Sequence, residues 1–163
     1  MKKKLFTTIY DNIKTLLGAL LIAILIRSLL FQPFYIPSSS MEPTLLVGDR
    51  IFVSKYTYGY SKHSFPFSPN FSSNRFFSQI PKRGDLVVFK TPADNRTDYI
   101  KRLIGLPGDQ IQFIDRNLYI NNSEIIKSRI SKNYKIYCGK KKINVNTFEE
   151  NLSNGKRYIS VYL

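Results

Sequence analysis

The chain has 163 residues, and its 25 basic and 11 acidic side chains give a formal net charge of +14 at pH 7. The hydrophobic content of 43% excludes an intrinsically disordered chain. Cys138 is the only cysteine, which excludes an intrachain disulfide and a cysteine-based metal cluster. The basic residues are spread along the chain, and we find neither an aromatic RNA-binding signature nor zinc-finger spacing. We therefore expect no nucleic-acid partner.

The N-terminal segment opens on lysines at positions 2–4 and continues into an apolar stretch over residues 13–31. At a rise of about 1.5 Å per residue, these 19 residues reach roughly 28 Å, close to the thickness of a bilayer core. We therefore expect one transmembrane helix over 13–31 that ends before Pro33. Arg27 lies near its end and is expected to extend toward the outer interface.

A cleaved secretory signal is the alternative interpretation of this segment. Its basic start and apolar middle fit, but residues 29–32 lack the small side chains of a cleavage site, which favours an uncleaved signal-anchor. The lysines up to position 14 predict a cytoplasmic N-terminus. We expect a basic cytoplasmic segment over 1–12, the membrane helix over 13–31 and an extracytoplasmic domain over 32–163.

Beyond the apolar segment, short runs of β-branched and aromatic residues between turn residues predict a mainly β domain. The expected strands are residues 50–56, 86–90, 98–104, 110–114 and 118–121. After Asn122 the pattern weakens, and we assign no element there.

Residues 58–79 are rich in Ser, Phe, Pro and Asn, and we expect a long loop. The loop contains more phenylalanines than an ordinary solvated loop would. Either they fill the core or they enter a lipid surface, and both alternatives stay open. The residues concerned are Phe65, Phe67, Phe71, Phe76 and Phe77.

The serine run at positions 38–40 is the first candidate for chemistry. Serine runs are common in linkers, but linkers are normally polar on both sides, and this run lies between two apolar segments. Pro37 and Pro43 restrict the backbone on both sides of Ser40. A rigid turn fixes a hydroxyl and lets neighbouring amides point at a developing oxyanion. We interpret Ser40 as a candidate nucleophile.

A serine nucleophile needs a base, and the expected strand at 98–104 offers Lys101. Strand alternation places Tyr99 and Leu103 on the face of Lys101, with Arg102 on the other face. An apolar face disfavours the charged ammonium, and an uncharged lysine amine can accept a proton. Serine paired with lysine is one recognised way to build a nucleophile without histidine. The alternative is an ordinary surface lysine beside Arg102.

Three motifs, their order and the preceding apolar segment closely resemble the type I signal peptidases of bacteria, over about residues 5–120. The motifs are Ser40-Met41-x-Pro43-Thr44-Leu45 followed by Gly48-Asp49, then Arg83-Gly84-Asp85-x-Val87-Val88-Phe89, then Lys101-Arg102-x-x-Gly105-x-Pro107-Gly108-Asp109. The resemblance implies a strand-rich, partly barrel-like fold, in line with the expected strands. It also implies a serine endopeptidase in the bacterial inner membrane that removes N-terminal signal peptides from exported preproteins.

The resemblance also implies a role for individual residues. Ser40 would be the nucleophile and Lys101 the general base, while the Ser38 hydroxyl and the Ser40 amide would form the oxyanion hole. Shallow apolar pockets would accept small side chains at substrate positions −1 and −3, and the lining positions are Phe34, Ile36, Met41, Leu45, Tyr99 and Ile100. The expected partners are signal peptides and the lipid bilayer, and we expect a monomer without a cofactor.

One family motif, resembling Gly-Asp-Asn-Arg-x-x-Ser-x-Asp-Ser-Arg, is not found in this sequence. In the family it contributes core strands and a serine that hydrogen-bonds the lysine. We therefore expect the C-terminal part of the catalytic domain to be missing. Two other interpretations stay open: a self-cleaving Ser-Lys repressor relative, and an inactive membrane-bound β module that binds peptide or lipid.

Overall fold

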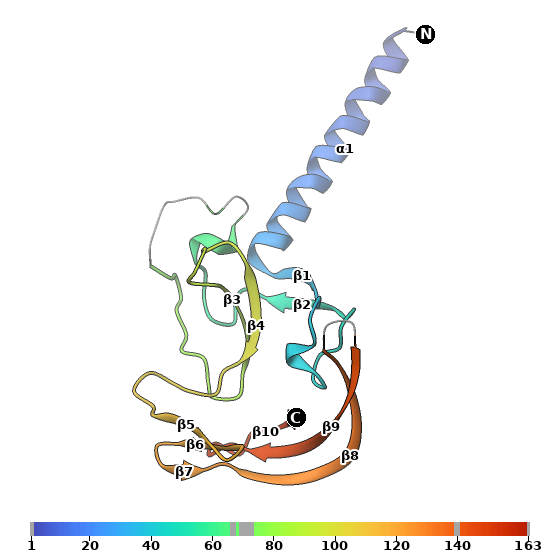
Figure 1. The fold of residues 1–163 in the computed structure, drawn as a ribbon. Coiled ribbons are helices and arrows are strands. Elements are labelled where there is room, and N and C mark those ends of the chain that lie inside the picture. The colour runs from blue at the N-terminus through green and yellow to red at the C-terminus, as the bar shows by residue number, and fades with distance from the viewer. Residues whose placement is uncertain (1, 66–67, 69–73, 139–140, 163) are drawn as a thin grey trace. The chain divides into compact units, whose positions relative to one another are not determined.

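A computed structural model describes residues 2–65, 68, 74–138 and 141–162 (Figure 1). The prediction of a mainly β chain with one N-terminal apolar helix is confirmed. The elements are α1 (Lys2–Leu29), β1 (Phe31–Tyr35), the 3₁₀ helix η1 (Ser39–Met41), β2 (Arg50–Ser54), the 3₁₀ helix η2 (Lys62–Ser64), β3 (Leu86–Lys90), β4 (Asp98–Arg102), β5 (Ile111–Ile114), β6 (Asn117–Ile120), β7 (Ser123–Glu124), β8 (Ile126–Cys138), β9 (Lys141–Asn151) and β10 (Arg157–Tyr162). They form two compact units, one from Met1–Phe34 with Phe52–Ile80 and one from Tyr35–Ile51 with Pro81–Leu163.

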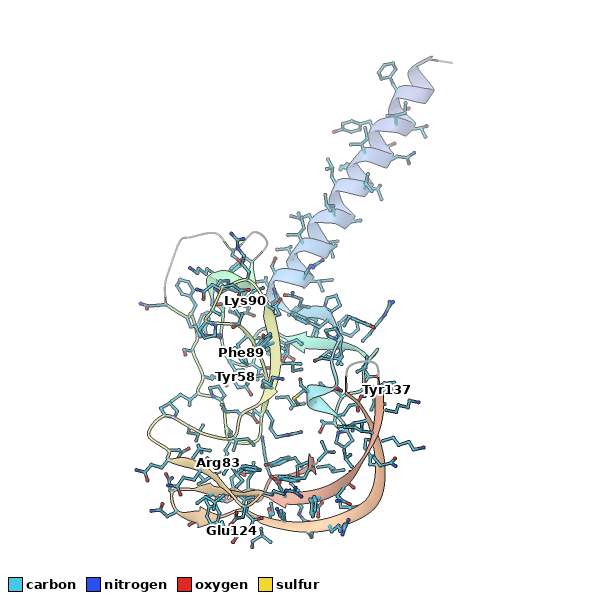
Figure 2. All side chains as sticks on the ribbon, in the orientation of Figure 1. Tyr58, Arg83, Phe89, Lys90, Glu124 and Tyr137 are labelled. Atoms are coloured by element: carbon cyan, nitrogen blue, oxygen red, sulfur yellow. The ribbon has the colours of Figure 1, made fainter. Side chains whose placement is uncertain are left out.

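Helix α1 is longer than the apolar stretch from which it was predicted. It begins at Lys2, and its 24 residues Phe6–Leu29 are long and apolar enough to cross a membrane. The side chains of this span are exposed, apart from Ser28, which is 5% exposed (Figure 2). The helix ends at Leu29, four residues before Pro33, so Phe31 belongs to β1 rather than to the helix.

The first unit continues from α1 into β1, which pairs with β2. The Tyr60 hydroxyl donates a hydrogen bond to the carbonyl of Leu29 at 2.9 Å, which ties the later segment of this unit to the end of the helix. The expected loop over residues 58–79 contains η2 and a short bridge between Tyr60 and Phe76.

The loop phenylalanines that the structure describes differ in exposure. Phe65 is half-buried, whereas Phe76 is exposed and Phe77 is 85% exposed. Phe76 and Phe77 therefore do not fill the core, while Phe67 and Phe71 lie outside the described residues.

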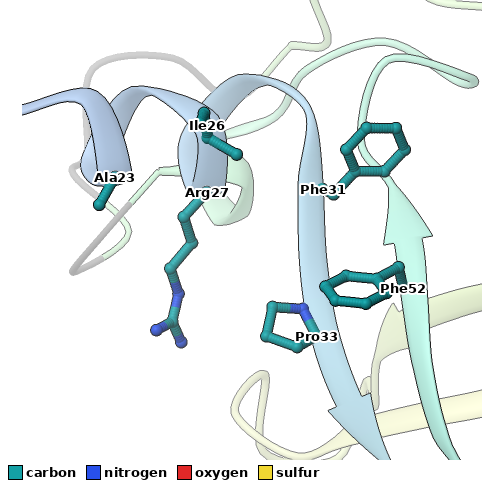
Figure 3. Close-up of a pocket in the computed structure, with 6 residues that line it drawn as sticks. All are labelled: Ala23, Ile26, Arg27, Phe31, Pro33 and Phe52. Carbon is teal, nitrogen blue, oxygen red and sulfur yellow. The ribbon is translucent and has the colours of Figure 1, made fainter.

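A pocket of about 570 Å³ lies in the first unit where α1 passes into the β1–β2 pair (Figure 3). One wall comes from the last turns of α1 and the other from the exposed face of β1 and from β2. The lining residues are Ala23, Ile26, Arg27, Phe31, Pro33 and Phe52.

The second unit contains the antiparallel pair β3–β4 and two three-stranded sheets. Strand β3 has the bounds predicted from the sequence, and its Val87 lies opposite Lys101 of β4. One sheet has the order β5-β6-β7 and the other β10-β9-β8. A small core of Ile120, Ile125 and Leu152 packs between segments of these two sheets.

The long strands β8 and β9, together with β10, were not predicted. Glu150 of β9 is 2% exposed, and its carboxylate accepts hydrogen bonds from Tyr158, from Tyr162 and from Ser160, the last at 2.7 Å. Burial and the hydrogen bonds to Glu150 raise the pKa of both tyrosine hydroxyls above the ordinary value. The buried carboxylate is thus fully partnered by donors from β10.

Candidate active site

The serine run lies in a loop whose ends are closed by backbone hydrogen bonds. The amide of Ile36 donates to the carbonyl of Asp49 at 3.0 Å, and the amide of Gly48 donates to the carbonyl of Ile36 at 2.9 Å. The carboxylate of Asp49 accepts from the amide of Leu46 at 2.8 Å. The Gly48-Asp49 part of the motif therefore closes the loop that carries Ser40.

Two apolar side chains of this loop are buried within the second unit. Ile36 is 3% exposed and Met41 is 8% exposed, whereas Ser40 between them is exposed. The amide of Leu45 donates to the carbonyl of Met41 at 2.9 Å, which continues the turn after η1. The loop thus buries its apolar side chains and leaves the Ser40 hydroxyl at the surface.

Strand β4 brings Lys101 to this hydroxyl. The Lys101 Nζ donates a hydrogen bond to the Ser40 Oγ at 2.5 Å, although the two residues are 61 positions apart in the sequence. Lys101 is half-buried, and its amine lies 5.9 Å from the centre of the Tyr99 ring on the same face of β4. The structure therefore brings together the two residues that the sequence proposed as nucleophile and base.

The Ser38 hydroxyl lies close to the Ser40 hydroxyl. The Ser38 and Ser40 Oγ atoms are 3.4 Å apart, which places Ser38 beside the candidate nucleophile. Both hydroxyls are exposed and accessible from solvent.

The residues proposed to line apolar pockets differ in exposure. Ile36 and Met41 are buried, Leu45 and Ile100 are half-buried, and Tyr99 is 48% exposed. All five belong to the second unit, as Ser40 and Lys101 do. Phe34 belongs to the first unit, where it is half-buried, and its part in substrate binding stays a prediction.

Arg102 takes the face of β4 opposite Lys101, as strand alternation predicts. Its guanidinium donates to the carbonyl of Gly84 at 2.9 Å and to the Thr44 hydroxyl at 3.2 Å, and it lies 5.0 Å from the centre of the Tyr158 ring. Burial lowers the pKa of this guanidinium. Because Thr44 follows η1 by three residues, Arg102 joins the serine loop to β4 and β10.

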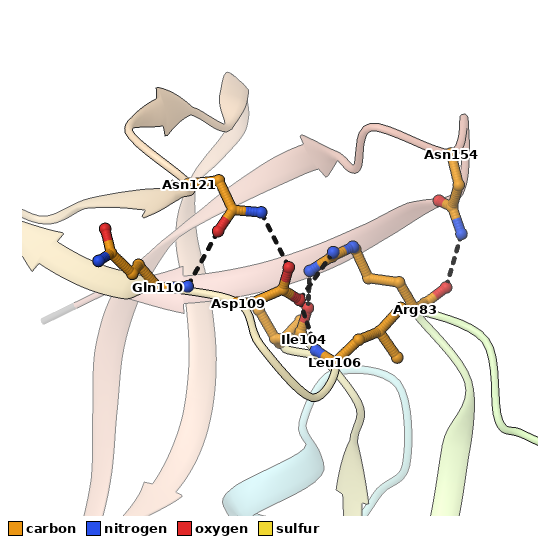
Figure 4. Close-up of polar contacts among 7 residues, drawn as sticks. All are labelled: Arg83, Ile104, Leu106, Asp109, Gln110, Asn121 and Asn154. Carbon is orange, nitrogen blue, oxygen red and sulfur yellow. Dashed lines mark hydrogen bonds and ion pairs between the residues drawn. The ribbon is translucent and has the colours of Figure 1, made fainter.

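Arg83 and Asp109 join the second and third sequence motifs (Figure 4). Their side chains form an ion pair at 2.8 Å, and Arg83 also donates to the carbonyl of Ile104 at 2.6 Å. The amide of Leu106 donates to Asp109 at 2.5 Å, and the side chain of Asn121 donates at 2.8 Å. These donors, followed by the charge of Arg83, lower the pKa of the Asp109 carboxyl. The network joins the segment before β3 to the segment after β4, at the end of the pair where Leu86 lies opposite Arg102.

Gly84 allows a close approach between the β3 turn and the C-terminal sheet. Its φ is +89°, and an added Cβ would lie 3.0 Å from the Leu152 side chain and 2.9 Å from that of Lys156. Gly108 has the same φ of +89°, but nothing lies within 4 Å of an added Cβ there. Both positions therefore favour glycine because of their positive φ, but only Gly84 also lacks room for a side chain.

We expect Gly108→Ala to lower the free energy of unfolding by about 1 to 2 kcal/mol, because a side chain is disfavoured at positive φ. Gly84→Ala should lower the free energy of unfolding by about 1 to 3 kcal/mol more than Gly108→Ala does, because its methyl group meets the buried Leu152. Urea unfolding followed by circular dichroism measures both values. Equal losses for the two variants would contradict the close approach at Gly84.

Sequence reasoning did not single out Glu42, which is 8% exposed. Its Oε2 accepts a hydrogen bond at 3.3 Å from the amide of Tyr137 in β8, 95 residues later. The sequence feature that could have pointed to Glu42 is its carboxylate, which lies in an otherwise apolar stretch next to the serine run. Glu42 thus connects the loop that carries Ser40 to the longest strand of the second unit.

Comparison with known proteins gives the same assignment as the motifs. The family model "Signal peptidase, peptidase S26" matches residues 9–159. The signal peptidase I of Rickettsia felis is 46% identical over 145 residues, which cover 87% of this chain and 53% of the relative. The signal peptidase I of Rickettsia bellii is 41% identical over 152 residues, which cover 92% and 51%.

The chain spans about half the length of the curated relatives that it matches. The match nevertheless covers nearly all of the chain, including the serine loop, the Arg83 turn and β4. This chain belongs to the signal peptidase family, peptidase S26.

Proposed function

We propose that the chain is a membrane-anchored serine endopeptidase that removes N-terminal signal peptides from exported preproteins. Ser40 is the nucleophile and Lys101 the general base. The observation that carries the proposal is the 2.5 Å contact between the Lys101 Nζ and the Ser40 Oγ. The relatives named signal peptidase I support the substrate class.

In the first half of the reaction, the uncharged Lys101 amine takes the proton of the Ser40 hydroxyl. The freed oxygen attacks the carbonyl carbon of the scissile peptide bond. The Ser38 hydroxyl and the Ser40 amide donate hydrogen bonds to the oxyanion that forms. When the carbon–nitrogen bond breaks, the ammonium of Lys101 returns its proton to the leaving amine. The mature protein departs, and the signal peptide stays on Ser40 as an ester.

In the second half, Lys101 takes a proton from a water molecule, and the resulting hydroxide attacks the ester carbonyl. The intermediate collapses, the proton returns to the Ser40 oxygen, and the signal peptide leaves as a carboxylic acid. The same amine therefore serves as base and acid in both halves. Every proton transfer in this scheme runs between Lys101 and the Ser40 oxygen, the leaving amine or the attacking water molecule.

The proposal places α1 across the inner membrane of a bacterium, with a cytoplasmic N-terminus and the rest of the chain on the outer side. The apolar span Phe6–Leu29 and the lysines at its start support this orientation. Apolar side chains near Ser40 and Lys101 accept small substrate residues at −3 and −1. The residues that line these pockets are Ile36, Met41, Leu45, Tyr99 and Ile100.

The specificity can be tested with the full chain in detergent and a preprotein that carries alanine at −3 and −1. We expect one product, whose mass places the new N-terminus directly after the −1 residue. Replacing the −1 alanine by leucine should abolish this product, because a larger side chain overfills a shallow pocket. Cleavage of both substrates at the same rate would contradict the proposed pockets. No cleavage of either substrate would favour the alternative, a membrane-bound β module without activity.

A further inference from the structure

The pocket at the end of α1 is not used by the chemistry proposed above. Among the described residues that line it, Arg27 is the one charged side chain and the others are apolar. Its volume of about 570 Å³ is in the ordinary range for ligand pockets. Strand β1 contributes its exposed face to this pocket, through Phe31 and Pro33. Phe34, which was proposed for substrate binding, is half-buried on the other face of β1.

The depth of Arg27 along the helix matches the level of lipid headgroups. The 24 residues Phe6–Leu29 extend about 36 Å, somewhat longer than a hydrocarbon core of about 30 Å. Arg27 lies two residues before the end of the helix, or about 3 Å along the axis. A centred span therefore places the Arg27 backbone at about the outer boundary of the hydrocarbon.

The apolar side chains of the pocket wall are exposed, and their contact with water is unfavourable. Phe52 is 76% exposed, and Phe31 and Ile26 are also exposed. Figure 3 shows the Arg27 side chain extending from the helix alongside this wall, with Pro33 and Phe52 beyond it. Among the residues that the structure describes, no ion pair involves Arg27. The site thus offers one unpaired guanidinium beside a surface suited to hydrocarbon.

We propose that this pocket binds one anionic phospholipid, with the phosphate on Arg27 and an acyl chain along Ile26, Phe31 and Phe52. The inference rests on the membrane anchorage proposed above. A guanidinium donates two parallel hydrogen bonds to a phosphate, and its charge is complementary to an anionic headgroup. The acyl chain covers the apolar wall at the same time.

Two other occupants fit the pocket less well. The apolar core of a signal peptide would cover the wall but would leave Arg27 buried without a counter-charge, which is costly. A second copy of the chain would bring another Arg27 and another net charge of +14. A phospholipid supplies both the missing charge and the missing apolar cover.

The test is native mass spectrometry of the full chain in detergent with added phosphatidylglycerol. We expect one retained phosphatidylglycerol, and weaker retention of phosphatidylcholine with the same acyl chains. Arg27→Gln should weaken phosphatidylglycerol binding about tenfold or more, because charge-assisted hydrogen bonds are lost. Phe52→Ala should weaken binding of both lipids without unfolding the chain, since this side chain is largely exposed.

Lys14→Gln is the matched control, because Lys14 is the other cation within the candidate span and does not line the pocket. It should leave phosphatidylglycerol retention unchanged. Equal retention by the wild type and Arg27→Gln would overturn the proposal, as would equal binding of the two lipids or an equal loss in Lys14→Gln. Displacement of the lipid by an apolar signal peptide, independent of Arg27, would also overturn it.

A Ser40→Ala variant separates this inference from the proposed function. It should retain phosphatidylglycerol as the wild type does, because Ser40 does not line the pocket. In the wild type, cleavage without lipid retention would remove the lipid site and leave the peptidase proposal standing. Lipid retention by a wild type that does not cleave would remove the peptidase proposal and leave the lipid site standing.

Discussion

Ser40→Ala is expected to lower kcat for signal-peptide cleavage by about 10⁴-fold or more, because it removes the atom that forms the acyl-enzyme. The loop around it should persist, since its backbone hydrogen bonds and the buried side chains of Ile36 and Met41 are unchanged. Cleavage of a preprotein by the full chain in detergent, followed by electrophoresis and mass spectrometry, measures the effect.

Ser39→Ala is the matched control for this experiment. Ser39 belongs to the same 3₁₀ helix, but the structure brings Lys101 to Ser40. Its substitution should leave kcat within a factor of a few of the wild type. Turnover that survives Ser40→Ala, or that disappears equally in Ser39→Ala, would show that the nucleophile lies elsewhere.

Lys101→Met is expected to have a similarly large effect, about 10³-fold or more on kcat, because general-base activation of the serine is lost. Methionine is close to lysine in length and keeps the apolar part of the side chain on β4. The Ser40 hydroxyl would stay in place without a proton acceptor. Circular dichroism should be unchanged, which separates loss of chemistry from loss of fold.

Lys101→Arg distinguishes a base from a charge that merely positions the serine. Arginine keeps the positive charge and hydrogen-bond donors but stays protonated, so it cannot accept the serine proton. It should therefore be as inactive as Lys101→Met. Lys90→Met, on the neighbouring strand β3, is the control and should retain activity. An active Lys101→Arg enzyme would contradict the role of Lys101 as base.

The candidate site was largely predictable because its residues lie in compact motifs. Strand β3 was placed to the residue, since an apolar run there follows directly on a glycine turn. Alternation along β4 correctly put Lys101 and Arg102 on opposite faces. The contact between Lys101 and Ser40 itself is tertiary; residue chemistry offered Lys101 as one candidate base, and the family resemblance paired the two residues.

The parts that were not predicted depend on contacts between distant segments. Strand β8 has the sequence Ile-Lys-Ser-Arg-Ile-Ser-Lys-Asn-Tyr-Lys-Ile-Tyr-Cys, whose mixed polarity gives no steady two-residue period. Its pairing with β9 stabilises it instead, and the hydrogen bonds from β10 to the buried Glu150 join β10 to β9. Helix α1 extends beyond the apolar stretch because residues 2–12 contain no proline or glycine to stop it.

The wide separation of Ser40 from Lys101 has a consequence for the newly synthesised protein. At a translation rate of about 5 to 20 residues per second, the codon for Lys101 is read about 3 to 12 s after that for Ser40. Tyr137, whose amide meets Glu42, arrives later still. For that interval the nascent polypeptide carries an ordinary alcohol with no amine beside it. Under the proposed mechanism, the growing chain therefore has a nucleophile without its general base until β4 has been made.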